Sequence, residues 1–223
     1  MYFIAIFFTE LLIIFILSRF VTSDISQFAY RISRSSKFAV YTLSFLFLPG
    51  TVIHELSHYI TAQLLFVRTG EMEFVPKIHE DRVKLGSVQI EKTDPVRRAL
   101  IGVAPFLIGT SLLMLILFIA EFYDGWGSIW HAVIICYILF EIGNTMFSSK
   151  KDMEGVLELF ACITIVGAIL FFAGVRIPEY VIRSLTTPST VSIFQKGSLY
   201  LLIPITIDIA IISMTKLSLR YLR

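Results

Sequence analysis

The sequence is short of charged residues, and this shortage excludes several classes of protein. Charged residues make up 16% of the 223 residues and hydrophobic residues 56%, and the mean hydropathy is +0.80. Soluble domains have about 25% charged residues. The net charge of +2 is too small to favour binding to nucleic acid. We therefore expect a polytopic membrane protein in contact with the lipid bilayer, without a nucleic-acid partner.

Cysteine is also scarce. Cys136 and Cys162 both lie within apolar runs, so they indicate neither a disulfide framework nor a thiolate metal site. A signal peptide is not expected either, because the first apolar run, 2–17, lacks a basic segment before it and a small-x-small cleavage site after it. Glu10 in the middle of this run indicates a retained helix. It serves either as a polar contact between helices or as a functional partner.

The apolar runs predict an all-α polytopic membrane protein with about six transmembrane helices and a single membrane domain, 1–223. The expected spans cover residues 2–17, 38–66, 99–122, 129–146, 153–173 and 198–217. Within the domain, we expect a first helix and interfacial loop (1–37), a core (38–159) and a remainder (160–223). Pro49-Gly50 predicts a kink in the second helix, although proline is also common in ordinary membrane helices.

A β-hairpin or small sheet is expected as an insert, 70–92, directly after the second helix. Residues 71–76 and 83–92 alternate apolar and polar side chains, and the KIHEDR segment between them is turn-like. An exposed strand edge beside a catalytic site would hold an extended substrate by main-chain pairing; the alternative is a plain connecting hairpin. After it, Asp94 is the expected N-cap of the third helix, with Pro95 in the first turn.

The second helix carries the sequence TVIHELSHYI, in which His54 and His58 are four residues apart. This spacing places both imidazoles on one helix face, where they can bind one zinc ion. In such H-E-x-x-H motifs the glutamate, here Glu55, is not a ligand and accepts a proton from the water that the zinc activates. Ionisable groups are costly in an apolar span, and a dication would compensate them. The alternative is a polar cluster between helices or around a water-filled vestibule.

A catalytic zinc needs a third protein ligand and an open position. Asp152 is the best candidate, because it follows the polar, helix-breaking segment 148–151. Glu141 and Glu154 are rivals, and Asp152 could instead be the N-cap of the fifth helix. Asp208, in the last span, is expected to pack or hydrogen-bond inside the bundle.

The sequence resembles the site-2 protease family of intramembrane zinc metalloproteases, which combine H-E-x-x-H with N-x-x-P-x-x-x-L-D-G in a later helix. Asn144 and Asp152 keep the offset of that motif's Asn and Asp. The resemblance implies that Asp152 is the third zinc ligand and that Asn144 binds substrate or stabilises the site. Phe147, Lys151 and Met153 stand where the family has Pro, Leu and Gly.

The resemblance extends over residues 38–159. Ala104-Pro105 is similar to a Gly-Pro pair in the intervening family helix, and 70–92 resembles the family's membrane-associated β-loop. It implies a metalloendopeptidase with one zinc per chain that cleaves membrane-protein substrates in or near a transmembrane segment. Two alternatives are a proteolytically inactive scaffold of the same fold, and a small ion transporter that uses buried carboxylates as a path.

Six spans would place both termini on the same side of the membrane. Lys and Arg residues are more frequent in the segments on the side of 67–98 than on the other. The positive-inside rule then predicts that both termini and the active-site side are cytoplasmic, in a multi-pass protein of the cell membrane.

Overall fold

The computed structural model describes most of residues 2–221. Left out are residues 75–76, 80–81, 85, 124–125, 148–149, 176–177, 180–182 and 184–185. For 77–79, 82–84 and 150–157 only the backbone is described.

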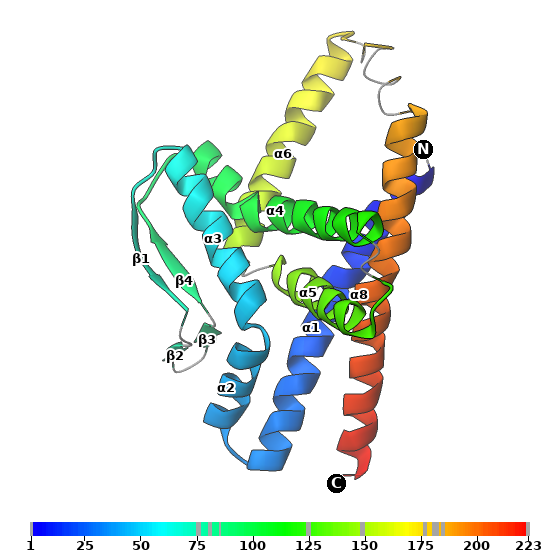
Figure 1. Ribbon diagram of the computed structural model, residues 1–223. Helices are drawn as coiled ribbons and strands as arrows, with labels where there is room; N and C mark the ends of the chain where they lie inside the picture. Colours follow the sequence, from blue (N-terminus) through cyan, green and yellow to red (C-terminus); the bar gives the residue numbers. More distant parts are fainter. Residues whose placement is uncertain are drawn as a thin grey trace.

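The chain is mostly helical, with short strands inserted between its third and fourth helices (Figure 1). The helices are α1 (Tyr2–Ser33), α2 (Ser36–Leu46), α3 (Leu48–Leu64), α4 (Pro95–Phe122), α5 (Ile129–Thr145), α6 (Lys150–Phe172) and α8 (Pro188–Tyr221). The strands are β1 (Thr69–Glu73), β2 (Lys77–His79), β3 (Arg82–Lys84) and β4 (Ser87–Ile90). A helical protein with a β insert after the motif helix is the expected arrangement.

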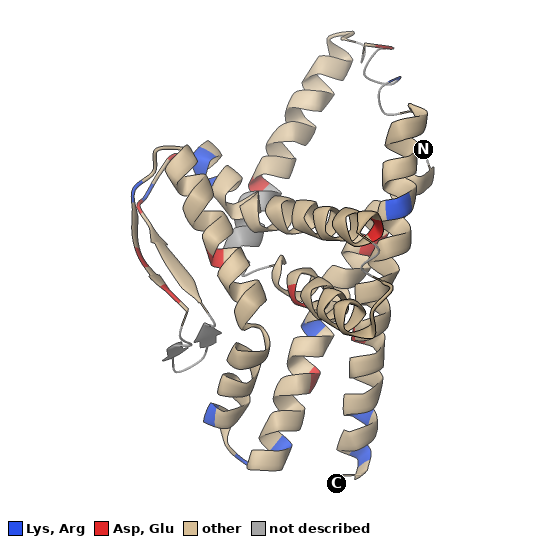
Figure 2. Cartoon of the chain, in the orientation of Figure 1, with Lys and Arg blue, Asp and Glu red and all other residues tan. Residues whose placement is uncertain are grey.

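Within the described residues, three helices, α1, α4 and α8, are long and apolar enough to cross a membrane. The pair α2 and α3 would make a fourth span if counted together, although it is bent by 70°. Two further apolar segments, α5 and residues Glu158–Phe172 of α6, are shorter. Figure 2 shows long uncharged stretches in α4 and α6. The chain is therefore a membrane protein, but the prediction of six spans is not confirmed.

Helix α1 is longer than the sequence analysis expected. It continues past the apolar run 2–17 to Ser33, through most of the segment up to residue 37 that was expected to be an interfacial loop. This segment has neither Gly nor Pro up to Ser33, and Val21, Asp24 and Ala29 are buried in it. Polarity alone was therefore a poor sign of a helix end, because one face of the segment packs inside the protein.

Helices α1 and α8 lie side by side and run in the same direction (Figure 1). Near their starts, the rings of Phe7 and Phe194 lie 5.3 Å apart, and toward their ends Lys216 Nζ lies 4.0 Å from Asp24 Oδ2. The two chain ends are therefore at opposite ends of this helix pair. That both termini lie on one side of the membrane depends on an even number of spans and stays a prediction. Helices α4 and α5 lie across the α1–α8 pair in Figure 1.

The main apolar core lies where α4 and α5 meet α1 and α8. Its most deeply buried members include Ile14, Leu113, Leu139, Ile142 and Leu201. The last turns of α5 lie inside this core, since every residue from Leu139 to Asn144 is buried. Polar side chains on these turns are therefore held away from solvent and from lipid.

The insert forms a hairpin, as predicted. Strands β1 and β4 pair antiparallel, with Thr69 opposite Ile90 and Glu73 opposite Ser87. The segment expected to be a turn contributes most of a second antiparallel pair, β2 with β3. Both β1 and β4 contact α3. The sheet thus lies against the helix that carries the H-E-x-x-H motif (Figure 1).

Candidate metal centre

The motif helix begins at a sharp break. Residues 38–66 are not one helix, because α2 ends at Leu46 and α3 starts at Leu48. The predicted kink is present, two residues before Pro49. Proline in the first turn of a helix costs nothing, since that turn has no internal acceptor for its N–H groups. Phe47, at the N-cap of α3, provides no side-chain hydrogen bond to these groups.

A carboxylate from α5 takes the place of the missing cap. Glu141 Oε2 accepts a hydrogen bond from the backbone N–H of Gly50 at 3.1 Å, and Glu141 is only 1% exposed. A negative or polar acceptor at a helix start satisfies the free N–H groups and matches the helix dipole. This contact fixes where α3 starts, one turn before His54. It uses one oxygen of Glu141 for structure, although the sequence had left Glu141 open as a rival zinc ligand.

The imidazoles of His54 and His58 meet on the buried face of α3. Both residues are 6% exposed, and their Nε2 atoms lie 3.1 Å apart. Two Zn–N bonds of about 2.05 Å at a tetrahedral angle place the nitrogens about 3.3 Å apart. The observed spacing therefore fits a shared zinc ion. An N–H···N hydrogen bond between the rings has a similar length, so the spacing is compatible with either state.

The second nitrogen of His58 shows which tautomer is present. His58 Nδ1 lies 2.8 Å from the carbonyl oxygen of Ile101 in α4. A carbonyl can only accept, so Nδ1 carries the proton and the neutral ring presents the lone pair of Nε2 toward His54. Histidines that bind metals usually donate their other N–H to a carbonyl or carboxylate in this way. His58 thus has the arrangement expected of a zinc ligand.

Glu55 lies beside the pair on α3, 9% exposed. The chain comes back against it at Gly86, just before β4. A Cβ on Gly86 would lie 3.0 Å from Glu55 Cγ and 2.7 Å from Thr51 Cγ2. Only a residue without a side chain lets the backbone approach this closely. The β insert therefore passes directly beside the carboxylate that was predicted from the sequence to be the catalytic base.

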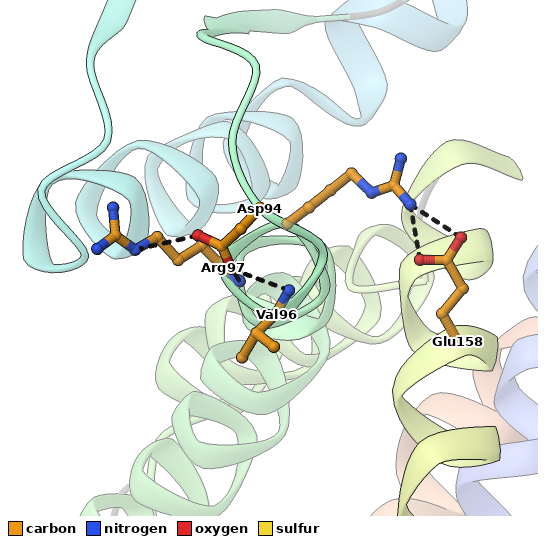
Figure 3. Close-up of polar contacts among 5 residues, drawn as sticks. Asp94, Val96, Arg97 and Glu158 are labelled. Atoms are coloured by element: carbon orange, nitrogen blue, oxygen red, sulfur yellow. Dashed lines mark hydrogen bonds and ion pairs between the residues drawn. The ribbon is translucent and has the colours of Figure 1, made fainter.

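The start of α4 is held by its own cap. As predicted, Asp94 is the N-cap and accepts hydrogen bonds from the N–H groups of Val96 and Arg97, both at 3.1 Å (Figure 3). The hydrogen bond from the Arg97 backbone holds the pKa of the Asp94 carboxyl below its usual value. The cap secures the turns of α4 that include Ile101, the partner of His58.

The same turns of α4 also bind α6. Arg98 donates two hydrogen bonds, of 2.9 and 2.7 Å, to the carboxylate of Glu158 (Figure 3). Both side chains are about half exposed, so the ion pair adds little stability but marks how the helices meet. Helix α4 is thus in contact with His58 on one side and with the helix that contains Asp152 on the other.

The predicted third ligand lies outside the described side chains. Asp152 and its rival Glu154 are in the first turns of α6, and only their backbone is described. Because α6 starts at Lys150, Asp152 is inside the helix and is not its N-cap. Among the side chains that are described, no group of three His, Cys, Asp or Glu residues is placed to hold a metal ion. Ligation by Asp152 therefore stays a prediction.

Asn144 joins two helices. Its Nδ2 donates to Asp208 Oδ1 at 2.8 Å and to the carbonyl of Phe140 at 3.0 Å. Asp208 is fully buried and hydrogen-bonded, as expected for a packing role. The amide nitrogen of Asn144 is thus engaged with α8 and with its own helix. Binding of substrate by Asn144 remains a prediction. Two of the buried carboxylates each accept a hydrogen bond from a neighbouring helix, Glu141 from Gly50 in α3 and Asp208 from Asn144 in α5.

Three contacts of this centre were not foreseen from the sequence. They are the bond from His58 to Ile101, the cap from Glu141 to Gly50, and the approach of Gly86 to Glu55. Each contact involves a residue type that stands out in the sequence, namely a proline, a carboxylate in an apolar run or a glycine. The sequence does not show which residue it contacts, because that residue lies on another segment of the chain.

Comparisons with protein-family models, with curated proteins and with solved structures found no match to this chain. The fold and sequence thus define a helical membrane protein with a buried histidine pair. The resemblance to the site-2 proteases rests on the sequence motifs and stays a prediction.

Proposed function

We propose that the protein is an intramembrane zinc metalloendopeptidase that hydrolyses peptide bonds in or near transmembrane segments of other membrane proteins. The observation that carries this proposal is the histidine pair. His54 and His58 bring their Nε2 atoms to 3.1 Å, and the Nδ1 proton of His58 is bound to a backbone carbonyl. The Nε2 lone pair of His58 therefore faces the ring of His54, which is where two ligands of one zinc ion would meet.

His54, His58 and Asp152 would hold the zinc. When bound, the ion lowers the pKa of a water molecule to about 7 and polarises the carbonyl of the substrate. This donor set, two imidazoles and a carboxylate, is common in zinc hydrolases. The distance of 3.1 Å between the Nε2 atoms of His54 and His58 is compatible with two ligands of one zinc ion.

Glu55 would transfer the protons. Its carboxylate accepts a proton from the attacking water and then donates it to the leaving amine, so that the two halves of the peptide separate as neutral groups. The residue is adjacent to His54 in the chain and almost fully buried. Burial keeps competing water away from the carboxylate and strengthens its electrostatic effect.

The β insert supplies the means of holding a substrate. Peptide hydrolysis requires an extended segment, since a helix engages its own carbonyls. Among the described strands, β1 and β4 pair only with each other, so each keeps one edge for main-chain hydrogen bonds. The chain reaches Glu55 at Gly86, immediately before β4. A locally unwound transmembrane segment paired to this sheet would lie near the proposed catalytic base.

The test is cleavage of a model membrane-protein substrate by the purified protein in micelles or vesicles. We expect zinc-dependent cleavage that Glu55→Gln lowers by about 10²–10⁴-fold. Bound zinc should remain, because Glu55 is not a ligand. Cleavage at the wild-type rate by Glu55→Gln would overturn the assignment of the base. Cleavage unaffected by removal of zinc would overturn the metalloprotease itself.

A further inference from the structure

Helix α4 contains a proline inside its membrane-spanning part. Pro105 lies three turns into α4, and the helix continues on both sides of it. In an α-helix, each carbonyl accepts a hydrogen bond from the N–H four residues later. The residue four before Pro105 is Ile101. Since proline has no N–H, the carbonyl of Ile101 is left without its usual donor.

This carbonyl is in a place where it cannot turn to solvent. Ile101 is 4% exposed and Pro105 is also buried. A buried carbonyl without a donor costs free energy, so such groups almost always find a partner. Here the partner comes from another helix, because His58 Nδ1 on α3 donates to the Ile101 carbonyl at 2.8 Å.

We infer that Pro105 is a positioning residue for His58. By removing one N–H from α4, it opens the Ile101 carbonyl to the imidazole. The bond then fixes both the orientation of the ring and its Nδ1–H tautomer, which directs the Nε2 lone pair toward His54. That this hydrogen bond prepares His58 to bind zinc rests on the proposed function. The positioning of His58 by Pro105 does not rest on it, since it depends only on a hydrogen bond between α3 and α4.

The substitution Pro105→Ala would restore the missing N–H of α4 and leave the side chains of His58 and Ile101 unchanged. This N–H would donate to the Ile101 carbonyl within the helix and compete with the imidazole. The proline ring also pushes against the carbonyl four residues before it, which tilts that carbonyl away from the helix axis. Alanine would release this tilt, and both effects would weaken the bond to His58.

The direct test is ¹⁵N NMR of the metal-free, full-length protein labelled at histidine, at a pH where the imidazoles are neutral. The His58 signals are assigned by their loss in His58→Gln. We expect the Nδ1–H tautomer of His58 in the wild type and a mixture of tautomers in Pro105→Ala. Pro204→Ala is the matched control, because Pro204 is also a buried proline inside a helix, in α8. This control should keep the wild-type tautomer.

The second readout is the dissociation constant for Co²⁺, a spectroscopic substitute for zinc. Loss of a hydrogen-bonding partner of a metal ligand costs about tenfold or more in affinity. We expect this loss in Pro105→Ala and a change below about threefold in Pro204→Ala. Wild-type tautomer and affinity in Pro105→Ala would overturn the inference and leave the proposed function standing.

Two further outcomes separate the claims. An Nε2–H tautomer of His58 in the wild type would overturn the inference even if no variant could be purified. A wild type that binds no Co²⁺ but shows the expected change of tautomer in Pro105→Ala would overturn the proposed function. In that case the positioning of His58 by Pro105 would still be supported.

Discussion

Glu141 on α5 caps α3 at Gly50, by a hydrogen bond of 3.1 Å between two residues that are 91 positions apart in the chain. The contact explains how a sharp break can exist inside an apolar helix pair. A break exposes backbone N–H groups, and these are costly in lipid unless another group accepts from them. The carboxylate supplies that acceptor one turn before the first histidine of the candidate metal centre.

Replacement of Glu141 by Leu should therefore destabilise the protein. The Gly50 N–H would be left buried without an acceptor, which costs about 1–3 kcal/mol. Glu141→Gln keeps an acceptor oxygen and should cost less. Unfolding by sodium dodecyl sulfate in mixed micelles measures both changes. If Leu and Gln had equal effects, the hydrogen bond to Gly50 would contribute nothing.

Gly50→Ala should disturb the same contact by steric means. The added Cβ would lie 2.7 Å from Thr145 Cγ2 and 2.8 Å from the carbonyl oxygen of Glu141. The carbonyl belongs to the backbone of α5, so α3 and α5 would have to separate. The expected result is a lower unfolding midpoint and weaker metal binding.

Gly167→Ala is the control for the glycine variants. A Cβ at Gly167 in α6 would meet no atom within 4 Å. Because alanine favours helix over glycine by about 1 kcal/mol, this variant should be as stable as the wild type or more stable. The double variant Gly50→Ala/Thr145→Ala removes the Thr145 side chain that the added Cβ meets. It should regain only part of the lost stability, since the Glu141 carbonyl remains near that Cβ. Full recovery of stability in the double variant would contradict the role of the carbonyl.

Gly86→Ala should separate catalysis from metal binding. The Cβ would lie 3.0 Å from Glu55 Cγ, so either the β insert or the carboxylate must move. The three atoms nearest to the added Cβ belong to Thr51 and Glu55 and not to the histidine pair. We expect cleavage of a model substrate to fall by at least about tenfold, as small displacements of catalytic groups do, with zinc content unchanged. A wild-type cleavage rate would show that the insert does not set the position of Glu55.

Part of this centre could be read from the sequence because its signals are local. The Asp94-Pro95 pair gives the start of α4, and the four-residue spacing of His54 and His58 places both on one helix face. The end of α1 was missed, since its polar segment looks like a loop until its buried face is seen. The Gly50 contact with Glu141 depends on tertiary packing, which no local pattern contains.

The cap of α4 should depend on pH. The Asp94 pKa is lowered in the folded protein, chiefly by the hydrogen bond from the Arg97 backbone. The charged cap is therefore fully effective above about pH 5, and its contribution is lost as the pH falls through about 4 and below, toward the lowered folded pKa. Asp94→Asn keeps a capping oxygen but does not titrate. The difference in thermal midpoint between the wild type and Asp94→Asn should shrink as the pH falls through this range, and a constant difference would contradict the cap.

The zinc content of the purified chain tests the central claim most directly. Protein purified without chelator should contain about one zinc per chain, and His54→Ala, His58→Ala and Asp152→Ala should each lose it, while Glu55→Gln should keep it. Zinc absent from the wild type, or retained when both histidines are replaced, would contradict the account.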